Sequence, residues 1–255
     1  MPGTRFFEQQ DGTKIAYQIF NSENAKIIVF DNRGIGESTV ASYNDPLTVE
    51  LMAQDTIALL KHLGIKRFNL FGTNMGARIA FETALKLPSD LKLEKIAVSS
   101  CAPKIDLNSG GSQKINKIHE LSSTPFPNDI QGQKDRLLEG EFDQDLSKYL
   151  LEHPDDLDKM AEIIISRYDA RPFEMMKRQW EANTTYELLP KLKEIKVPTL
   201  VIHAENDLFF SNKEAELLSK ELSNSKLYNI PNMGNNIFVK DRETTANVIS
   251  EFLNN

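Results

Sequence analysis

The order of strand-like and helix-like segments constrains the fold of this chain more than any other feature. Three short apolar segments predict buried strands at 26–30 (KIIVF), 67–71 (RFNLF) and 95–100 (KIAVSS). Between them, residues 45–63 and 77–87 carry apolar side chains near a 3.6-residue period, which predicts helices. A hairpin around the turn Asp11-Gly12 precedes them. Alternating strands and helices are typical of an α/β domain with a mostly parallel sheet.

The middle of the chain differs from both ends, because no strand pattern occurs from 102 to 192. Helices are predicted there over 113–121, 145–151, 155–167 and 172–189. The alternation resumes with strands at 197–204 and 226–230 and helices at 212–222 and 243–253. We therefore expect one α/β core, residues 1–103 and 193–255, with residues 104–192 inserted as a helical cap, and both halves of the core in one sheet.

Composition and charge exclude several classes of function. The net charge of −7, with 30 basic residues interspersed among 37 acidic ones, argues against binding to nucleic acid. The single cysteine, Cys101, excludes an internal disulfide and a cysteine-rich metal site. No apolar run reaches secretory or membrane-spanning length. We expect a cytoplasmic protein with no metal, no cofactor and no membrane partner.

Five segments, in this order, resemble the α/β-hydrolase superfamily across essentially the whole chain, and the resemblance is to its esterase- and lactonase-like members. They are DGTKIAYQIF, IIVFDNRGIGES, NLFGTNMGARIA, PTLVIHAENDLFF and YNIPNMGNNIF. The resemblance implies a mostly parallel central sheet with a helical cap after its third central strand–helix unit. It also implies that DNRGIGES is a structural turn in which Arg33 pairs with a carboxylate or carbonyl. A dinucleotide-binding motif is disfavoured, because the third glycine position of that motif is Thr39.

The resemblance places the catalytic positions on residues that cannot perform the family's chemistry. The nucleophile turn GxSxG is read here as Gly72-Thr73-Asn74-Met75-Gly76, so Asn74 stands at the nucleophile position. The delocalised amide nitrogen of asparagine is a poor nucleophile. The backbone N–H of Met75 matches one of the two oxyanion donors.

The base and acid positions also depart from the family's pattern or lose their role. The base position is Asn235, and none of the four histidines lies in its loop: His62, His119, His153 and His203. The acid position is Asp207. With no histidine to orient, we predict that Asp207 is a turn carboxylate capping the helix near Asn212.

A third departure is a short connection between Phe20 and Lys26. Only residues 21–25 stand where the resembled family carries a further central strand, an oxyanion loop and a helix, roughly 30 residues in all. The second oxyanion donor is then missing, and segment 26–30 must shift sideways or border a gap. Removing a nucleophile or base costs a serine protease about 10⁶ in rate. We therefore predict a member of the α/β-hydrolase superfamily that has lost acyl transfer, a pseudoenzyme with a degenerate triad.

Three alternatives for its function stay open. A pseudoenzyme would bind a small apolar molecule under the cap, through Thr73, Asn74 and Met75 and through Phe173, Met176 and Trp180. These last three residues are also typical of the core face of an amphipathic helix. An active esterase or lactonase would use an atypical residue such as Asp207 or Cys101, although a structural role is expected for Cys101. A protein-interaction module would use the cap or an exposed strand edge.

Overall fold

The computed structural model describes residues 2–21, 25–105, 125–139, 144–167, 169–207, 209–234 and 237–254. Its strands are β1 (Arg5–Glu8), β2 (Lys14–Asn21), β3 (Lys26–Phe30), β4 (Arg67–Thr73), β5 (Lys92–Ser99), β6 (Thr199–Ala204) and β7 (Ser225–Ile230). They form an antiparallel sheet in the order β1-β2-β3 and a parallel sheet in the order β4-β5-β6-β7. Both halves of the core share the second sheet, as predicted, because β5 pairs with β6.

The helices are α1 (Val49–His62), α2 (Met75–Leu85), α4 (Ile130–Leu138), α5 (Gln144–Glu152), α6 (Pro154–Ser166), α7 (Phe173–Thr185), α8 (Asn212–Glu221), α9 (Ile237–Lys240) and α10 (Arg242–Asn254), with a 3₁₀ helix η1 (Leu189–Glu194). Helix α1 begins later than the predicted residue 45. The side chain of Thr48 caps it by accepting a hydrogen bond from the backbone N–H of Leu51. No helix among the described ranges is long and apolar enough to span a membrane.

The parallel sheet is buried on both faces. All six residues of β6 are buried; Val201 packs in the cluster that contains Leu218 of α8, and Leu200 and Ile202 pack in the cluster that α9 and α10 complete. A strand covered on both faces needs a continuous apolar segment, as its sequence TLVIHA shows. Because the four strands are parallel, their carboxyl ends meet at one edge, where loops position functional residues.

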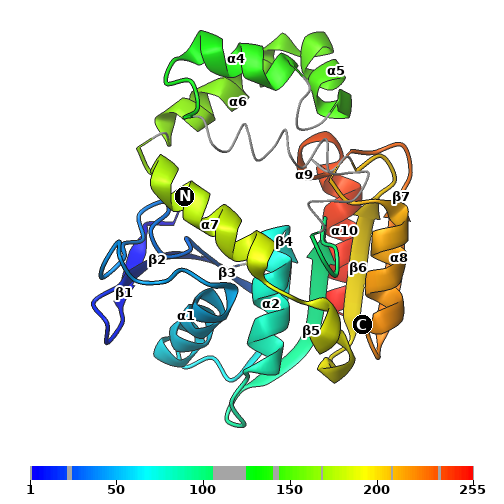
Figure 1. Ribbon diagram of the computed structural model, residues 1–255. Coiled ribbons are helices and arrows are strands. Elements are labelled where there is room, and N and C mark those ends of the chain that lie inside the picture. Colours follow the sequence, from blue (N-terminus) through cyan, green and yellow to red (C-terminus); the bar gives the residue numbers. More distant parts are fainter. Residues whose placement is uncertain are drawn as a thin grey trace.

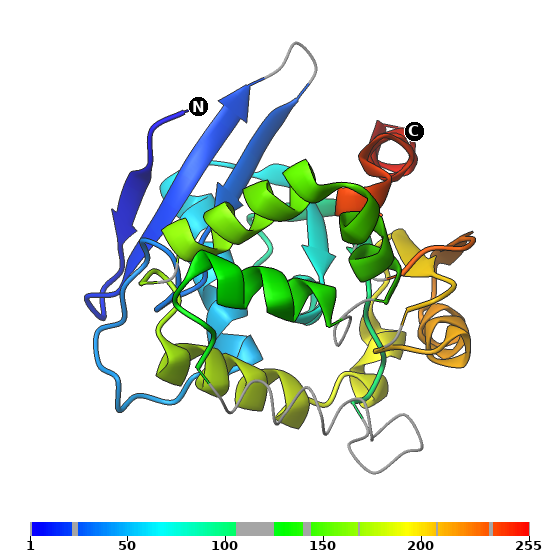
Figure 2. The same cartoon turned by 90° about the horizontal axis from the view of Figure 1, so that it is seen from above.

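The two sheets are not joined, since β3 pairs with β2 and β4 begins the second sheet. We expected both faces of β3 to be covered, and this was wrong: Ile27 is 54% exposed and Val29 is 46% exposed. One face of the small sheet packs Ile15 and Tyr17 against Leu59 of α1, but no described helix covers the other face. The β2–β3 hairpin projects beyond the rest of the molecule (Figure 2). Segment 26–30 was expected either to shift sideways or to border a gap. Among the described residues it borders a gap, because β3 does not pair with β4.

Helices α4 to α7 are inserted between β5 and β6, as the helical pattern predicted. Helices α4, α5 and α6 lie above the carboxyl ends of the strands, and α7 runs diagonally between them and α2 (Figure 1). The helices predicted at 145–151 and 155–167 are confirmed as α5 and α6. The helix predicted at 172–189 is confirmed as α7, but α7 ends at Thr185, and a separate 3₁₀ helix, η1, begins at Leu189. The helix predicted at 113–121 lies outside the described residues. The cap boundaries 104 and 192 stay a prediction.

Candidate functional site

The turn between β4 and α2 has the backbone of a nucleophile elbow. Asn74 has φ 51° and ψ −119°, a conformation that residues other than glycine rarely adopt. Its backbone N–H donates to the carbonyl of Ser99 at 3.1 Å, which ties the turn to the end of β5. Its own carbonyl accepts the N–H of Ala77, also at 3.1 Å, and starts α2. The strained residue is thus held from both sides.

The glycines of the turn allow the strand and the helix to approach each other. A Cβ on Gly72 would lie 2.3 Å from the carbonyl oxygen of Gly76, so a side chain at position 72 would collide with backbone. The close approach raises residue 74 above the sheet, and the side chains of Thr73 and Asn74 are exposed there while Met75 is half-buried. The predicted elbow geometry is therefore present, with a carboxamide at its apex.

Asp207 lies after β6 in a turn that holds one of its carboxylate oxygens. Oδ1 accepts the backbone N–H groups of Phe209 and Phe210 at 2.8 and 3.1 Å. Burial of the carboxyl group raises its pKa, although these two N–H groups favour the charged form. Oδ2 is buried and has no hydrogen-bond partner. The prediction of a turn carboxylate is confirmed.

The predicted capping role of Asp207 is wrong. Helix α8 is capped by Ser211, whose hydroxyl accepts the N–H of Glu214 while the Glu214 carboxylate accepts the N–H of Ser211. A serine four residues after Asp207 with a glutamate three residues later is the signal that would have indicated the correct cap.

Two further polar residues flank Asp207, and neither had been predicted as part of the site. Ser100 and His203 lie close enough to the Asp207 carboxyl group to favour its charged form, against the effect of burial. Ser100 and His203 are each 2% exposed, and Nε2 of His203 has no hydrogen-bond partner. Ser100 has φ 47°, a second strained residue at the edge of the sheet. Because Ser99 pairs with Ile202, the next residues on the two strands are neighbours, which a sequence without strand register does not reveal.

The two described histidines outside this cluster, His62 and His153, have other surroundings. Asn235 lies outside the described residues, and so does His119. His62 ends α1 and stacks on Phe7, with ring centroids 4.5 Å apart. His153 precedes α6 and stacks on Tyr149. Among the described parts of the chain, no group of three or more His, Cys, Asp or Glu residues is arranged to hold a metal ion.

The predicted ligand contacts are divided between two places. Phe173 and Met176 line a cavity beside α6, and none of the elbow residues lines it. Trp180, one turn further along α7, packs instead with Ala102 and Phe210. Its indole N–H is buried and has no hydrogen-bond partner. The contacts predicted at the elbow are thus separate from the cavity that Phe173 and Met176 line. Trp180 lies apart from that cavity, next to the turn of Asp207.

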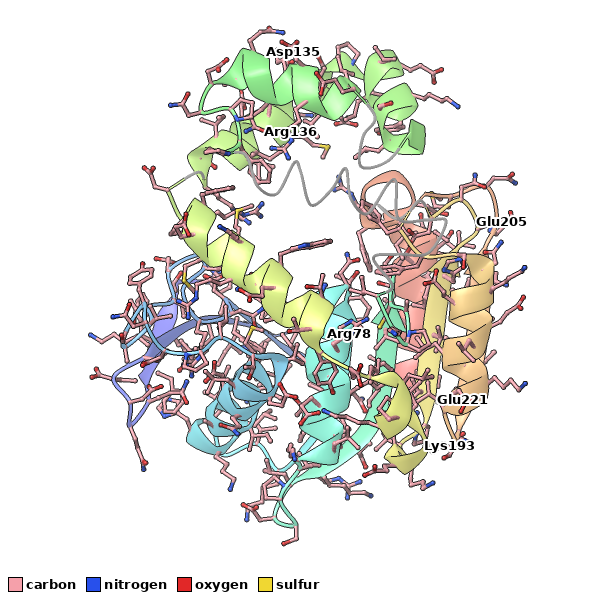
Figure 3. All side chains as sticks on the ribbon, in the orientation of Figure 1. Arg78, Asp135, Arg136, Lys193, Glu205 and Glu221 are labelled. Atoms are coloured by element: carbon pink, nitrogen blue, oxygen red, sulfur yellow. The ribbon has the colours of Figure 1, made fainter. Side chains whose placement is uncertain are left out.

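Arg78 on α2 connects the elbow helix to both ends of the inserted helices, a role that the sequence did not indicate. The residue is 1% exposed and lies between α2 and α7 (Figure 3). Its guanidinium donates to the carbonyl of Ala102, before the insertion, at 3.0 Å, and to that of Tyr186, after α7, at 2.8 Å. The nearby Cys101 is buried, which raises the pKa of its thiol to about 11. That burial agrees with the structural role expected for Cys101.

A second buried contact holds the end of α7. The hydroxyl of Tyr186 donates to Oε2 of Glu82 at 2.6 Å, and the ammonium of Lys191 lies 3.1 Å from the same oxygen. Glu82 is fully buried, and burial of the Tyr186 hydroxyl, together with its hydrogen bond to the Glu82 carboxylate, raises the pKa of Tyr186. Arg78 and Glu82 are four residues apart on α2, so one helix carries both the elbow and the attachment of the cap.

Comparison with known proteins identifies the fold and the family. Residues 10–234 match the family model of the serine aminopeptidases, S33. The proline iminopeptidase of Lactobacillus crispatus is 22% identical over 244 residues, which cover 91% of this chain and 81% of that protein. Human monoacylglycerol lipase ABHD6 is 23% identical over 251 residues, 92% of this chain and 69% of that protein.

Solved structures give the same result for the fold. The enol-lactonase of Burkholderia xenovorans LB400 superposes with a TM-score of 0.76 at 18% identity, over 98% of this chain and 100% of that chain. MGS-M2, an α/β-hydrolase from a Medee basin deep-sea metagenome library, gives a TM-score of 0.78 at 20% identity, over 98% of both chains. The inserted helices and the parallel sheet are those of an α/β-hydrolase. The chain belongs to the serine aminopeptidase (S33) family of the α/β-hydrolase superfamily.

Proposed function

We propose that this chain binds a small apolar molecule under its cap and does not carry out acyl transfer at the elbow. The observation that carries the proposal is Asn74, an exposed carboxamide at the strained apex of the β4–α2 turn. Acyl transfer needs a nucleophile that can be deprotonated and a base that takes the proton. A carboxamide supplies neither, and the base position implied by the resemblance is also an asparagine, Asn235.

The retained strain supports a role in binding for this corner. A non-glycine residue in a sparsely populated backbone region costs on the order of 1–3 kcal/mol. Such strain persists only where its surroundings impose it, and here the hydrogen bonds to Ser99 and Ala77 do so. The corner exposes the amide of Asn74 and the hydroxyl of Thr73, which are hydrogen-bonding groups suited to orient a ligand.

The experiment is hydrolysis of 4-nitrophenyl acetate and butyrate by the purified chain and by its Asn74→Ala variant. We expect equal rates, because the carboxamide takes no part in bond breaking. A wild-type rate well above that of the variant would overturn the proposal. The double variant Asn74→Ser with Asn235→His is expected to remain inactive, since the second oxyanion donor is also missing.

An active hydrolase with an atypical site is the second candidate. The cluster of Ser100, His203 and Asp207 favours it, because these residue types supply nucleophile, base and acid in other hydrolases. The relatives support it at least as well as the first candidate, since they are named as a peptidase, a lipase and a lactonase. A fluorophosphonate probe followed by peptide mapping, with Ser100→Ala as the control, separates the two. Labelled Ser100 supports a hydrolase, and the absence of any labelled peptide leaves it without support.

A further inference from the structure

A cavity of about 170 Å³ lies beside α6 and the start of α7, and nothing in the elbow lines it. An apolar cavity of about 150 Å³ is large enough to bind benzene. The cavity therefore has room for a small ligand with one aromatic ring or a short alkyl chain. Its two ends differ in chemistry.

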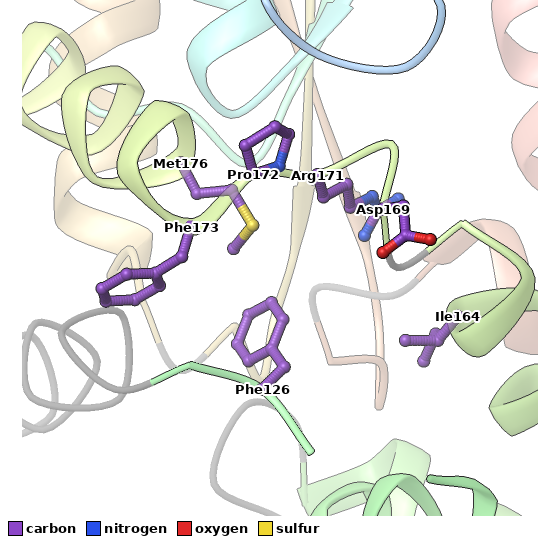
Figure 4. Close-up of a pocket in the computed structure, with 7 residues that line it drawn as sticks. All are labelled: Phe126, Ile164, Asp169, Arg171, Pro172, Phe173 and Met176. Carbon is purple, nitrogen blue, oxygen red and sulfur yellow. The ribbon is translucent and has the colours of Figure 1, made fainter. Parts of the chain in front are cut away.

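One end is apolar and is assembled from three separate segments. Phe126 precedes α4, Ile164 belongs to α6, and Phe173 and Met176 belong to α7. Figure 4 shows the rings of Phe126 and Phe173 and the thioether of Met176 turned toward a common space. All four side chains are half-buried, so they retain apolar surface that a ligand can cover.

The ring of Phe126 is also in contact with a charged side chain of α4. The guanidinium carbon of Arg136 on α4 lies 3.6 Å from the centroid of this ring, a cation–π contact. A side chain that is fixed before binding loses less entropy when a ligand arrives. The apolar end is thus at least partly preorganised.

The other end carries one acid and one base, Asp169 and Arg171, which Figure 4 shows on the same side of the cavity. A ligand carboxylate placed here would be attracted by Arg171 and repelled by Asp169, and a ligand ammonium would experience the reverse, so the two contributions largely cancel. A neutral group that both donates and accepts hydrogen bonds satisfies the two side chains together, because a carboxylate only accepts and a guanidinium only donates. An ionic head group thus gains no net attraction that would offset the loss of its hydration, and a neutral head group is favoured.

We propose that this cavity binds a neutral amphiphile with an aryl or alkyl body and a hydroxyl or primary amide head. The body lies among Phe126, Ile164, Phe173 and Met176, and the head lies between Asp169 and Arg171. This inference goes beyond the proposed function, because no residue of the β4–α2 turn lines the cavity. It does not depend on whether the elbow is catalytic.

The test uses four compounds with one hydrocarbon body: 4-phenyl-1-butanol, 4-phenylbutyrate, 4-phenylbutylamine and butylbenzene. Isothermal titration calorimetry on the full chain should rank the alcohol as the tightest ligand. Phe173→Ala should weaken alcohol binding about tenfold, or about 1.4 kcal/mol, because this half-buried aromatic side chain lines the cavity. Lys177→Ala, on the exposed side of the same helix, is the matched control and should leave affinity unchanged.

Neutralising each charge of the cavity in turn tests the role of the head-group site. Asp169→Asn should raise the affinity for 4-phenylbutyrate about threefold to fivefold, and Arg171→Gln should do the same for 4-phenylbutylamine, the range for a partly exposed charge pair. The proposal would be overturned by any of three results: the wild type binds an ionic compound most tightly, neither neutralising substitution changes the affinity, or no compound shows saturable binding. Ester turnover reports on the elbow separately, so an active esterase that still binds the alcohol would refute only the loss of catalysis.

Discussion

Replacing Tyr186 with phenylalanine tests how the cap is attached to the core. The hydroxyl of Tyr186 donates to the buried carboxylate of Glu82 at 2.6 Å, across 104 residues of sequence. The variant keeps the ring, which is 6% exposed, and removes only this hydrogen bond. A hydrogen bond to a charged group contributes about 1.5–3 kcal/mol, so we expect a loss near 2 kcal/mol. Lys191 stays within reach of the carboxylate and limits the loss.

The measurement is the melting temperature by scanning calorimetry. Unfolding entropy is about 2.1 cal/mol/K per residue, or roughly 0.5 kcal/mol/K for a chain of this length, so 2 kcal/mol corresponds to a fall of about 4 °C. Tyr43→Phe is the control, because this side chain is 62% exposed and its loss should change stability by less than about 0.5 kcal/mol. Equal shifts for the two variants would refute the assignment of Tyr186 and Glu82 as the attachment.

Three further outcomes follow from the structure. Gly72→Ala should destabilise the chain by about 3 kcal/mol or more, because its Cβ would meet the backbone of Gly76 at 2.3 Å; an unchanged urea midpoint would contradict this. Cys101, buried with a thiol pKa of about 11, should react with 5,5′-dithiobis(2-nitrobenzoate) at pH 8 only after denaturation, and prompt labelling of the native chain would be inconsistent with that burial. Asp207→Asn should gain stability relative to the wild type as pH rises. The folded-state pKa of Asp207 is raised, so its favourable contribution is complete below the unfolded pKa and is lost as pH increases through the folded pKa; melting curves at pH 4 and pH 8 with the same difference would argue against it.

The elbow and the parallel sheet could be predicted because their signals are local. The glycines at 72 and 76 indicate a close approach of strand and helix, and the segment TLVIHA indicates a strand covered on both faces. These features depend on residues within one segment. The structure therefore reproduces them with shifts of a few residues at the ends.

Features that depend on contacts between distant segments could not be predicted. The placement of Ser100 and His203 beside Asp207 depends on the register of β5 and β6, and the role of Arg78 depends on two carbonyls 84 residues apart, those of Ala102 and Tyr186. Neither follows from a periodic pattern.

The exposure of β3 also depends on contacts between distant segments. The segment KIIVF reads as a buried strand, since apolar β-branched residues favour one. Burial also requires a covering element, and no described helix packs on the side of Ile27 and Val29. The residues of a strand do not indicate whether another element of the chain covers each of its faces.

The most direct test of the central claim is intact-protein mass spectrometry after rapid quenching of a reaction with 4-nitrophenyl butyrate. We predict an unchanged mass at every time point, because the residue at the elbow is Asn74 and it forms no acyl bond. A butyryl increment that peptide mapping assigns to the turn of residues 72–76 would contradict it.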